Sequence, residues 1–96
     1  MSRFPEALLE RISHLPDSPG VYLWRDADGT VLYVGKAKRL RSRVRSYVNG
    51  DHLESVKTRA LMMSVAGLET IVVPSEAHAL ILEANLIKEY KPKYNI

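Results

Sequence analysis

A β-hairpin is the feature of this sequence that most restricts its fold. Two short runs rich in β-branched and aromatic residues, Val21–Arg25 and Thr30–Val34, flank the segment Asp26–Gly29, which ends in Asp-Gly. An Asp-Gly pair between two such runs is a strong signal for a tight turn between antiparallel strands. Further along, Leu68–Val73 has the composition of a third strand and is stopped by Pro74.

The register of the hairpin decides where its tyrosines lie. If all four loop residues turn, Tyr22 faces Tyr33 across the hairpin. If only the Asp-Gly pair turns, Trp24 faces Tyr33 instead. Both loops have an even length, so both place Tyr22 and Tyr33 on one face of the sheet unless a bulge intervenes. The residues expected on the opposite face, which packs the core, are Val21, Leu23, Leu32 and Val34.

A strongly basic segment follows the hairpin. Six cations gather between residues 36 and 45, and no acidic residue occurs between Asp28 and Asp51. On a chain with a net charge of only +3, this concentration favours contact with a polyanion, and the alternative is a solvated helix face. The cations are Lys36, Lys38, Arg39, Arg41, Arg43 and Arg45.

The same segment has the spacing of an amphipathic helix that begins directly after Gly35 and ends at Asn49-Gly50-Asp51. Its apolar stripe consists of Ala37, Leu40, Val44 and Val48. Lys36, Arg43 and Tyr47 fall on a second line beside this stripe, so we expect them to point one way, near the tyrosine strand. The cations expected to point elsewhere, toward solvent or a nucleic-acid backbone, are Lys38, Arg41 and Arg45.

Three more helices are expected. They span Ser2–His14, Leu53–Val65 and Glu76 to about Tyr90, the last with Ser75 as its N-cap. A chain of 96 residues is long enough for one core and not for two, so we expect a single domain over residues 1–96. The abrupt end of the chain after Lys91–Ile96 leads us to expect that this domain is cut from a longer protein.

Glu83 is an isolated carboxylate on the last of these helices. It projects into the middle of an apolar surface that consists of Leu80, Ala84 and Ile87, with Ala79, Leu82 and Leu86 beside them. A carboxylate in such surroundings must be paired, protonated or bound to a metal, because an isolated buried charge is costly. From the helix alone, an ion pair with Arg43 or Lys36 and a metal site are both open.

The composition excludes several classes of protein. The sequence has no cysteine, which excludes disulfide frameworks, thiol catalysis and thiolate metal sites and fits a cytosolic protein. No apolar run approaches the ~20 residues of a membrane span, and the N-terminus lacks the apolar run of a secretory signal peptide. We therefore expect a cytoplasmic protein that does not enter a membrane.

Two triplets of the hairpin, Gly20-Val21-Tyr22 and Tyr33-Val34-Gly35, resemble the paired signature of the GIY-YIG nucleases. Longer segments are similar, more specifically, to the N-terminal endonuclease domain of the UvrC family of bacterial excision-repair subunits. The resemblance extends from about Leu15 to Ile96. The segments that carry it are Tyr33–Leu40, Arg43–Tyr47, Leu82–Lys88 and Pro92–Asn95.

The resemblance implies a small α/β (α+β) fold of the GIY-YIG type, in which helices flank a three-stranded antiparallel sheet. It implies an endonuclease of the excinuclease ABC system that makes the 3′ incision in damaged double-stranded DNA during nucleotide excision repair. UvrB would load the enzyme through parts of the protein outside this chain, and Glu83 would hold one divalent cation, Mg²⁺ or Mn²⁺. The implied active-site residues are Tyr22, Tyr33, Lys36, Arg43, Tyr47, Glu83 and Asn95.

The chain departs from the resemblance at one position. Many relatives have an acidic residue where this chain has His78, and that acid would form a capping box with the residue at the helix start. Here we expect Ser75 to cap the helix alone and His78 to lie at the surface.

The chemistry of these residues suits phosphodiester hydrolysis. Glu83 supplies a hard oxygen ligand, and Mg²⁺ accepts few protein ligands. The guanidinium of Arg43 has a fork of donors that fits a non-bridging phosphate oxygen. A phenol is a poor base at its ordinary pKa near ~10, but nearby cations lower that pKa, so we expect Tyr33 to act as general base or to position the water.

The remaining residues of the predicted site have supporting roles. Tyr22 and Tyr47 are expected to orient water or phosphate, and their alternative is a purely structural role with solvated hydroxyls. Asn95 is expected to support the site by hydrogen bonding. The residues expected to contact DNA are Lys38, Arg39, Arg41 and Arg45.

Two other functions are open at this point. One is a DNA-binding module on the same scaffold without activity, and the other is a nuclease of the same fold that acts on another target, such as branched DNA. Only an enzyme needs Glu83, Tyr33 and Arg43 together, so their joint presence favours the enzyme.

Overall fold

Three antiparallel strands form the centre of the molecule. The computed structural model describes residues 4–50 and 55–95. The sheet has the order β2-β1-β3, with β1 (Gly20–Arg25) between β2 (Val31–Ala37) and β3 (Gly67–Val72). The other elements are the helices α1 (Glu6–Ser13), α2 (Leu40–Val48), α3 (Val56–Ser64) and α4 (Glu76–Tyr90), and the 3₁₀ helix η1 (Lys93–Asn95).

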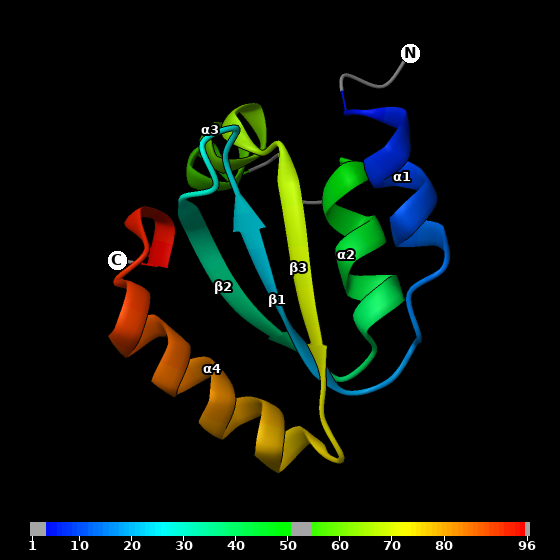
Figure 1. Ribbon diagram of the computed structural model, residues 1–96, viewed down its shortest axis with the longest axis vertical. Helices are drawn as coiled ribbons and strands as arrows, with labels where there is room; N and C mark the ends of the chain where they lie inside the picture. The colour runs from blue at the N-terminus through cyan, green and yellow to red at the C-terminus, as the bar shows by residue number, and fades with distance from the viewer. Residues whose placement is uncertain (1–3, 51–54, 96) are drawn as a thin grey trace.

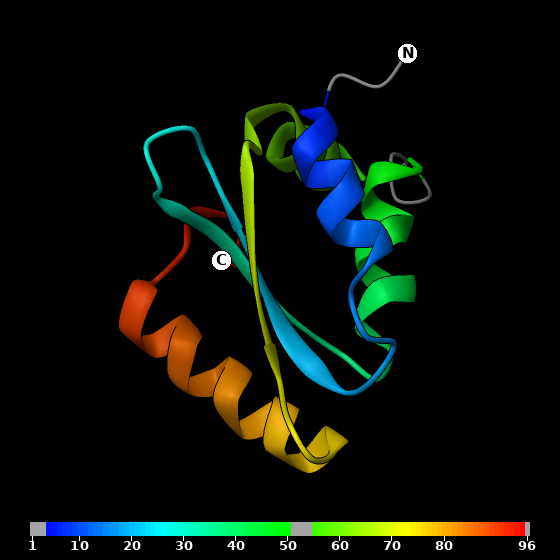
Figure 2. The same ribbon diagram turned by 45° about the vertical axis from the view of Figure 1, so that its right-hand side comes forward.

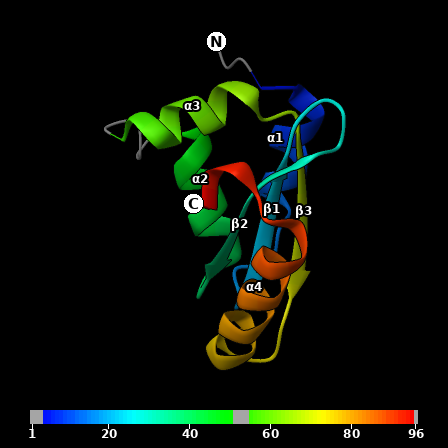
Figure 3. The same cartoon turned by 90° about the vertical axis from the view of Figure 1, so that its left-hand side faces the viewer.

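Helices cover both faces of this sheet. α1 and α2 lie against one face and α4 lies against the other (Figures 1 and 2), while α3 lies across one end (Figure 3). A larger core that includes Trp24 and Leu40 lies on the α2 side, and a smaller core that includes Val21 and Ala79 lies under α4. The expected fold class is confirmed. None of the helices within the described ranges is long and apolar enough to cross a membrane.

From Gly20 to Trp24 the hairpin has the pairing of the second expected register, but its turn is neither of the two expected, because the Asp26 N–H donates to the Thr30 carbonyl and residues 27–29 form the loop. Trp24 pairs with Tyr33, and Tyr22 pairs with Gly35. Residues that face each other in adjacent strands project to the same side of the sheet, so Tyr22, Trp24 and Tyr33 share one face. The shared face of the two tyrosines is therefore confirmed, and it is the face that α2 covers.

A bulge lies just beyond this pair. The register shifts between Trp24 and Arg25, so that Arg25 pairs with Val31. The shift turns Leu32 to the tyrosine face and Val31 to the opposite face. The expectation for Leu32 was therefore wrong. The opposite face packs a core as expected, but that core is the smaller of the two, and the larger core lies on the tyrosine side.

Strand β2 continues further than the sequence predicted. It reaches Ala37, and α2 begins only at Leu40. Lys36 pairs with Val21, whose side chain packs under α4, so alternation places Lys36 on the α4 side of the sheet. The expected helical line that joins Lys36 to Arg43 was therefore wrong.

Helix α4 has the predicted bounds but buries a narrower face. Ser75 caps it by accepting a hydrogen bond from the His78 N–H, and the Nδ1 of His78 lies 2.7 Å from the Ser75 hydroxyl. His78 is a surface residue as expected, but it joins the cap. Leu80 is 54% exposed, so the apolar stripe expected around it was wrong. The helix packs on the sheet through Ala79, Leu82, Leu86 and Ile87.

The remaining bounds differ from the prediction by a few residues. The first helix is Glu6–Ser13, and β3 begins one residue earlier, at Gly67. α3 begins at Val56, and the predicted start of this helix at Leu53 lies outside the described residues. α2 ends at an Asn49 cap followed by Gly50 with a φ of +85°, as the sequence predicted.

Candidate active site

Three tyrosines come together where α2 packs on the hairpin. The ring centroids of Tyr22 and Tyr47 are 5.6 Å apart, and those of Tyr22 and Tyr33 are 6.3 Å apart. The hydroxyls of Tyr22 and Tyr47 lie 3.0 Å apart and form a buried hydrogen bond. Tyr22 is only 1% exposed, so the alternative of a solvated hydroxyl was wrong for this residue.

The glycines of the two signature triplets permit this packing. Gly35 lies directly across from Tyr22 in the sheet, and a Cβ on Gly35 would overlap the Tyr22 ring. A Cβ on Gly20 would overlap the side chain of Leu40 and lie 2.6 Å from the carbonyl oxygen of Ile71. A side chain at either glycine would therefore displace Tyr22 or the start of α2.

Arg43 joins the tyrosines from α2. Its guanidinium carbon lies 5.8 Å from the centre of the Tyr47 ring, one helical turn further along α2. The Tyr22 hydroxyl also interacts with Arg43, and this interaction is the main cause that raises the pKa of Arg43. A guanidinium has five donors, so this contact leaves others for an anion. The tyrosine pair thus orients a cation at the edge of the cluster.

The tyrosine hydroxyls are weaker acids than the sequence led us to expect. Burial above all, with additional contributions from Tyr47 and the negative charge of Glu83, raises the pKa of Tyr33 to about 12. The charge of Arg43 lowers the pKa of Tyr33, but by less. Burial also raises the pKa of Tyr22, and more strongly. Among the residues that the structure describes, burial outweighs the effect of Arg43, so the acidic phenol expected from its protein neighbours is not found, and the effect of a bound cation on Tyr33 stays a prediction.

Glu83 is half-buried on the face of α4 that turns toward the sheet. Its charge raises the pKa of Tyr33, so the carboxylate and the phenol interact although α4 and the tyrosine cluster lie on opposite faces of the sheet. Within residues 4–50 and 55–95, Glu83 takes part in no ion pair and no hydrogen bond. The alternative of an ion pair with Arg43 or Lys36 is therefore not found in this part of the chain.

An unpaired, half-buried carboxylate suits a hard cation. In the part of the chain that the structure describes, no group of three or more His, Cys, Asp or Glu side chains is placed to hold a metal ion. The metal role of Glu83 stays a prediction, and a cation held by this one carboxylate would complete its coordination with water or phosphate oxygens.

Asn95 closes the outer edge of β2 beside the tyrosines. Its Nδ2 donates to the Val34 carbonyl at 2.9 Å, and its Oδ1 accepts from the Val34 N–H at 2.8 Å. Val34 follows Tyr33 in the chain, so these bonds fix the strand that presents the phenol. The supporting hydrogen bonds expected of Asn95 are present, and its part in the reaction stays a prediction.

A groove of about 890 Å³ opens between the start of α2 and the start of α4, where β2 ends. Its lining includes Lys36 and Arg43, but not Tyr33 or Glu83. Arg43 both lines this groove and contacts Tyr47, so the groove adjoins the predicted site at Arg43.

A smaller hollow of about 110 Å³ lies on the other side, against Tyr33 and Tyr47. Its lining is completed by Tyr94 of η1, which belongs to the segment Pro92–Asn95, and by three residues of α3 to which no motif pointed, Lys57, Thr58 and Leu61. The sequence could not select them, because α3 carries no recognisable pattern and its placement depends on tertiary packing.

Asp17 supports the start of α2, a role that was not predicted from the sequence. The N-cap residue of α2 is Arg39, which makes no side-chain cap bond. Asp17 replaces it: one carboxylate oxygen accepts from the Ser42 N–H at 3.0 Å, and the other accepts from the Ser42 hydroxyl at 2.9 Å. These bonds, led by the backbone one, lower the pKa of Asp17. Nothing in the local sequence indicated this role, because Asp17 lies 25 residues before Ser42.

The four cations expected to contact DNA fall into two groups. Arg39 forms an ion pair with Asp17 at 3.0 Å, and Arg41 donates to the Leu15 carbonyl at 3.3 Å, so both brace the loop before β1. Lys38 lines the groove, and Arg45 is exposed in the last turn of α2. Contact of any of the four with DNA stays a prediction.

Comparison with known proteins identifies relatives of this arrangement. The family model for the UvrC-like GIY-YIG domain matches residues 18–96. UvrABC system protein C from Gemmatimonas aurantiaca is 70% identical over 87 residues, which cover 91% of this chain and 14% of that protein. The chain spans 14–15% of the length of the curated relatives that it matches.

Solved structures agree with this comparison. The crystal structure of the GIY-YIG N-terminal endonuclease domain of UvrC from Thermotoga maritima, bound to its catalytic divalent cation magnesium, is 45% identical with a TM-score of 0.84. The match covers 97% of this chain and 100% of that one. A point mutant of the same domain with an asparagine replaced by alanine, bound to its catalytic divalent cation, has a TM-score of 0.85 and 44% identity and covers 97% and 99% of the two chains.

Proposed function

This chain belongs to the UvrC-like GIY-YIG domain family, and we propose that it is a metal-dependent endonuclease domain that makes the 3′ incision in damaged DNA during nucleotide excision repair. The observation that carries the proposal is the convergence of charges on one phenol. Glu83 from α4 and Arg43 from α2 both act electrostatically on Tyr33 of β2. A carboxylate, a guanidinium and a phenol that interact with one another are groups that can serve hydrolysis of a phosphodiester.

The proposed cofactor is one divalent cation, Mg²⁺ or Mn²⁺, held by Glu83. Two observations support this assignment. The carboxylate is half-buried and has no partner within the described residues, and the related Thermotoga maritima domain binds magnesium as its catalytic cation. When bound, the cation would stabilise negative charge on the phosphoryl and leaving oxygens as a Lewis acid.

Side chains of the protein would bind the phosphate and position the attacking water. Arg43, oriented by Tyr22 and Tyr47, binds a non-bridging oxygen through its free donors. Tyr33, with its pKa raised to about 12, is protonated at neutral pH. It is therefore suited to position the attacking water by hydrogen bonding, and it is a weaker candidate for general base. Tyr22 is too deeply buried to touch substrate and acts as a positioning residue for Arg43.

Two further residues support the substrate and the strand. Lys36, exposed at the end of β2, adds positive charge beside the scissile phosphate. Asn95 fixes β2 through its two bonds to Val34 and thereby fixes the position of Tyr33. Lys36 and Asn95 would act through their positions in the structure, and neither would transfer a proton.

We propose the biological setting from the relatives. The curated proteins that match are named UvrABC system protein C and are much longer than this chain, so residues 1–96 would be one domain of a longer protein. That protein would act in the cytoplasm on damaged double-stranded DNA, with UvrB as the loading partner through other parts of the chain. A DNA-binding module without activity is less favoured, because it would not need an unpaired carboxylate near Tyr33 and Arg43.

Replacing Glu83 with glutamine tests the proposed function. The assay is incision of a lesion-containing duplex by the full-length protein with UvrB and Mg²⁺, and the control is Glu89→Gln, an exposed carboxylate on the same helix. We expect Glu83→Gln to lose about 10²- to 10³-fold in rate, with the Glu89 variant unchanged and both variants folded. A wild-type rate in Glu83→Gln would remove the metal role and with it the proposed mechanism.

A further inference from the structure

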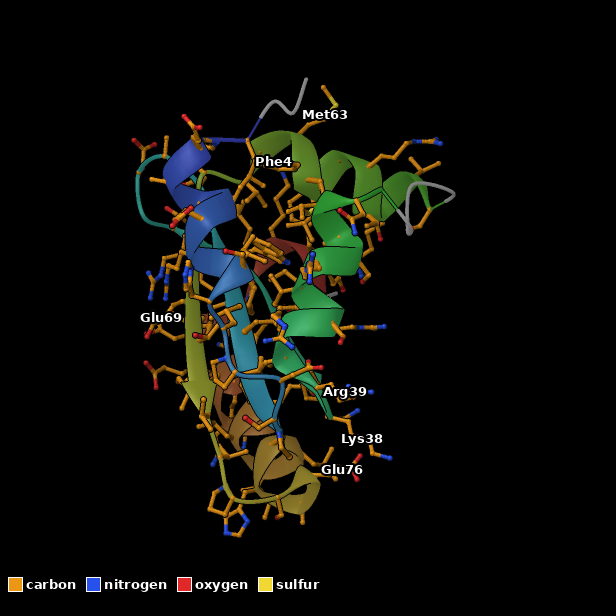
Figure 4. The ribbon with its side chains drawn as sticks, turned by 90° about the vertical axis from the view of Figure 1, so that its right-hand side faces the viewer. Phe4, Lys38, Arg39, Met63, Glu69 and Glu76 are labelled. Atoms are coloured by element: carbon orange, nitrogen blue, oxygen red, sulfur yellow. The ribbon has the colours of Figure 1, made fainter. Side chains whose placement is uncertain are left out.

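The groove beside the active site has two walls of different chemistry. One wall, from the end of β2 and the start of α2, carries Lys36, Lys38 and Arg43. The other wall is the first turns of α4, and it presents the apolar side chains of Ala77, Ala79 and Leu80 together with the carboxylate of Glu76. Figure 4 shows Lys38 and Arg39 at the start of α2 and Glu76 at the start of α4 on the same side of the molecule.

This asymmetry fixes how a nucleic-acid strand would lie. Phosphates belong on the cationic wall, because Lys36, Lys38 and Arg43 attract them and Glu76 on the opposite wall repels them. The α4 wall has an apolar side chain, Leu80, that is 54% exposed. Such a side chain gains from contact with the faces of bases and sugars, which are the apolar parts of a nucleotide.

We propose that this groove binds an unpaired stretch of the DNA strand that is cut, with its phosphates on the α2 wall and its bases and sugars on the α4 wall. The inference rests on the proposed endonuclease function, and it assigns the substrate form at that site. The strand enters the active site directly from the groove, since Arg43 belongs to both. On α4, Ala79 in the groove and Glu83 beside Tyr33 are one helical turn apart on one face.

The geometry favours an unpaired strand over a duplex for two reasons. In a duplex the base faces are stacked inside and only phosphates, sugars and base edges reach a protein surface, so Leu80 would have no base face to contact. The groove volume of about 890 Å³ is also in the range of sites for small ligands, which suits a few nucleotides and not a double helix.

Binding of three DNA probes to the Glu83→Gln protein, in which cutting is expected to be strongly slowed, tests the inference. The probes are a short single strand, the matching duplex, and the same duplex with a few mismatched pairs. The test variant is Leu80→Ser, and Ile81→Ser is the matched control, because Ile81 is the next residue of α4, is 62% exposed and does not line the groove. Fluorescence anisotropy at fixed salt gives the dissociation constants.

We expect Leu80→Ser to weaken binding of the single strand and of the mismatched duplex by about fivefold and to leave the matched duplex unchanged. Ile81→Ser should behave as the parent protein with all three probes. Equal effects of the two variants, or an equal loss on the matched duplex, would overturn the inference. Such a result would leave the endonuclease proposal intact, because that proposal is decided by incision in the Glu83 and Glu89 variants.

The charged residues give an independent check of the strand's orientation. Glu76→Gln should tighten binding of the single strand, because it removes a repulsive carboxylate from the groove. Lys38→Gln should weaken binding of this probe and reduce the dependence of affinity on salt, whereas Lys88→Gln, exposed near the other end of α4, should do neither. Unchanged affinity in Glu76→Gln, or equal effects of the two lysine variants, would contradict the assignment of phosphates to the α2 wall and of bases and sugars to the α4 wall.

Discussion

The side-chain amide of Asn95 pairs with both backbone polar groups of Val34, in the way that a neighbouring strand would. The two bonds measure 2.8 and 2.9 Å and join residues 61 positions apart in the chain. β2 is an edge strand, and an edge strand has backbone groups without partners. The Asn95 amide provides partners for the N–H and the carbonyl of Val34, the residue after Tyr33. Residue Asn95 of η1 therefore holds β2, which carries the Tyr33 phenol, in place.

Asn95→Ala should therefore destabilise the protein and slow incision. The change leaves the N–H and the carbonyl of Val34 without this partner, which costs about 1–3 kcal/mol when such groups stay away from water. Thermal unfolding measures the loss, and incision under single-turnover conditions measures the effect on the site. Asn85→Ala, on the exposed side of α4, is the control. Equal melting temperatures for the two variants would contradict the role assigned to Asn95.

Gly35→Ala should displace Tyr22 and disorganise the cluster. A Cβ at Gly35 overlaps the Tyr22 ring, and forcing a methyl into a packed core costs about 1–3 kcal/mol. Gly67→Ala is a matched control in the same sheet, since its Cβ would meet only the Arg25 Cβ at 3.9 Å, an ordinary contact. Denaturant unfolding compares the two. A Gly35 variant as stable as the Gly67 variant would show that the close approach to Tyr22 does not matter.

The folded protein should lose stability in alkaline solution. The pKa values of Tyr33, about 12, and of Tyr22 are raised by burial, so the folded state keeps protons that the unfolded state releases above its ordinary tyrosine pKa near ~10. Stability from these tyrosines is complete below pH ~10 and declines as pH rises toward 12. Urea unfolding between pH 8 and 11 should show this decline for the wild type and a shallower one for Tyr22→Phe. Identical slopes would contradict the assigned burial effect.

Asp17→Asn should weaken the start of α2. The carboxylate caps Ser42 and pairs with Arg39, and its lowered pKa means that the folded state favours the ionised form. Its contribution to stability is present above the unfolded pKa near ~3.9 and is lost as pH falls through the lower folded pKa. The variant should melt at a lower temperature at pH 7, and this difference should shrink in acid. Asp28→Asn, in the exposed hairpin loop, should change neither value.

Local patterns in the sequence were sufficient for the hairpin and the bounds of α4, because strand composition and the Asp-Gly pair indicate the first and Ser75 marks the start of the second. The shared face of the tyrosines holds because the bulge between Trp24 and Arg25 offsets the odd length of the loop, which the sequence did not indicate. The end of β2 was misplaced because Gly35 looks like a strand terminator. In the structure it stays in the strand, where its missing side chain makes room for the Tyr22 ring.

Properties that arise only from tertiary packing could not be predicted. The pKa of Tyr33 rises because the strand, α2 and the C-terminal segment bury it, and nothing in the neighbouring sequence encodes that burial. Asp17 caps α2 from 25 residues before Ser42, a distance at which capping patterns give no signal. Likewise, the exposure of Leu80 depends on the direction in which α4 crosses the sheet.

The central claim is that Glu83 holds a divalent cation beside Tyr33 and Arg43. The most direct test is anomalous diffraction from crystals grown with Mn²⁺, for the wild type and for Glu83→Gln. The account predicts one strong peak in the wild type at coordinating distance, about 2.0–2.3 Å, from a Glu83 carboxylate oxygen, on the side facing the tyrosines, and no such peak in the variant. A peak bound elsewhere, or an equal peak in Glu83→Gln, would contradict the account.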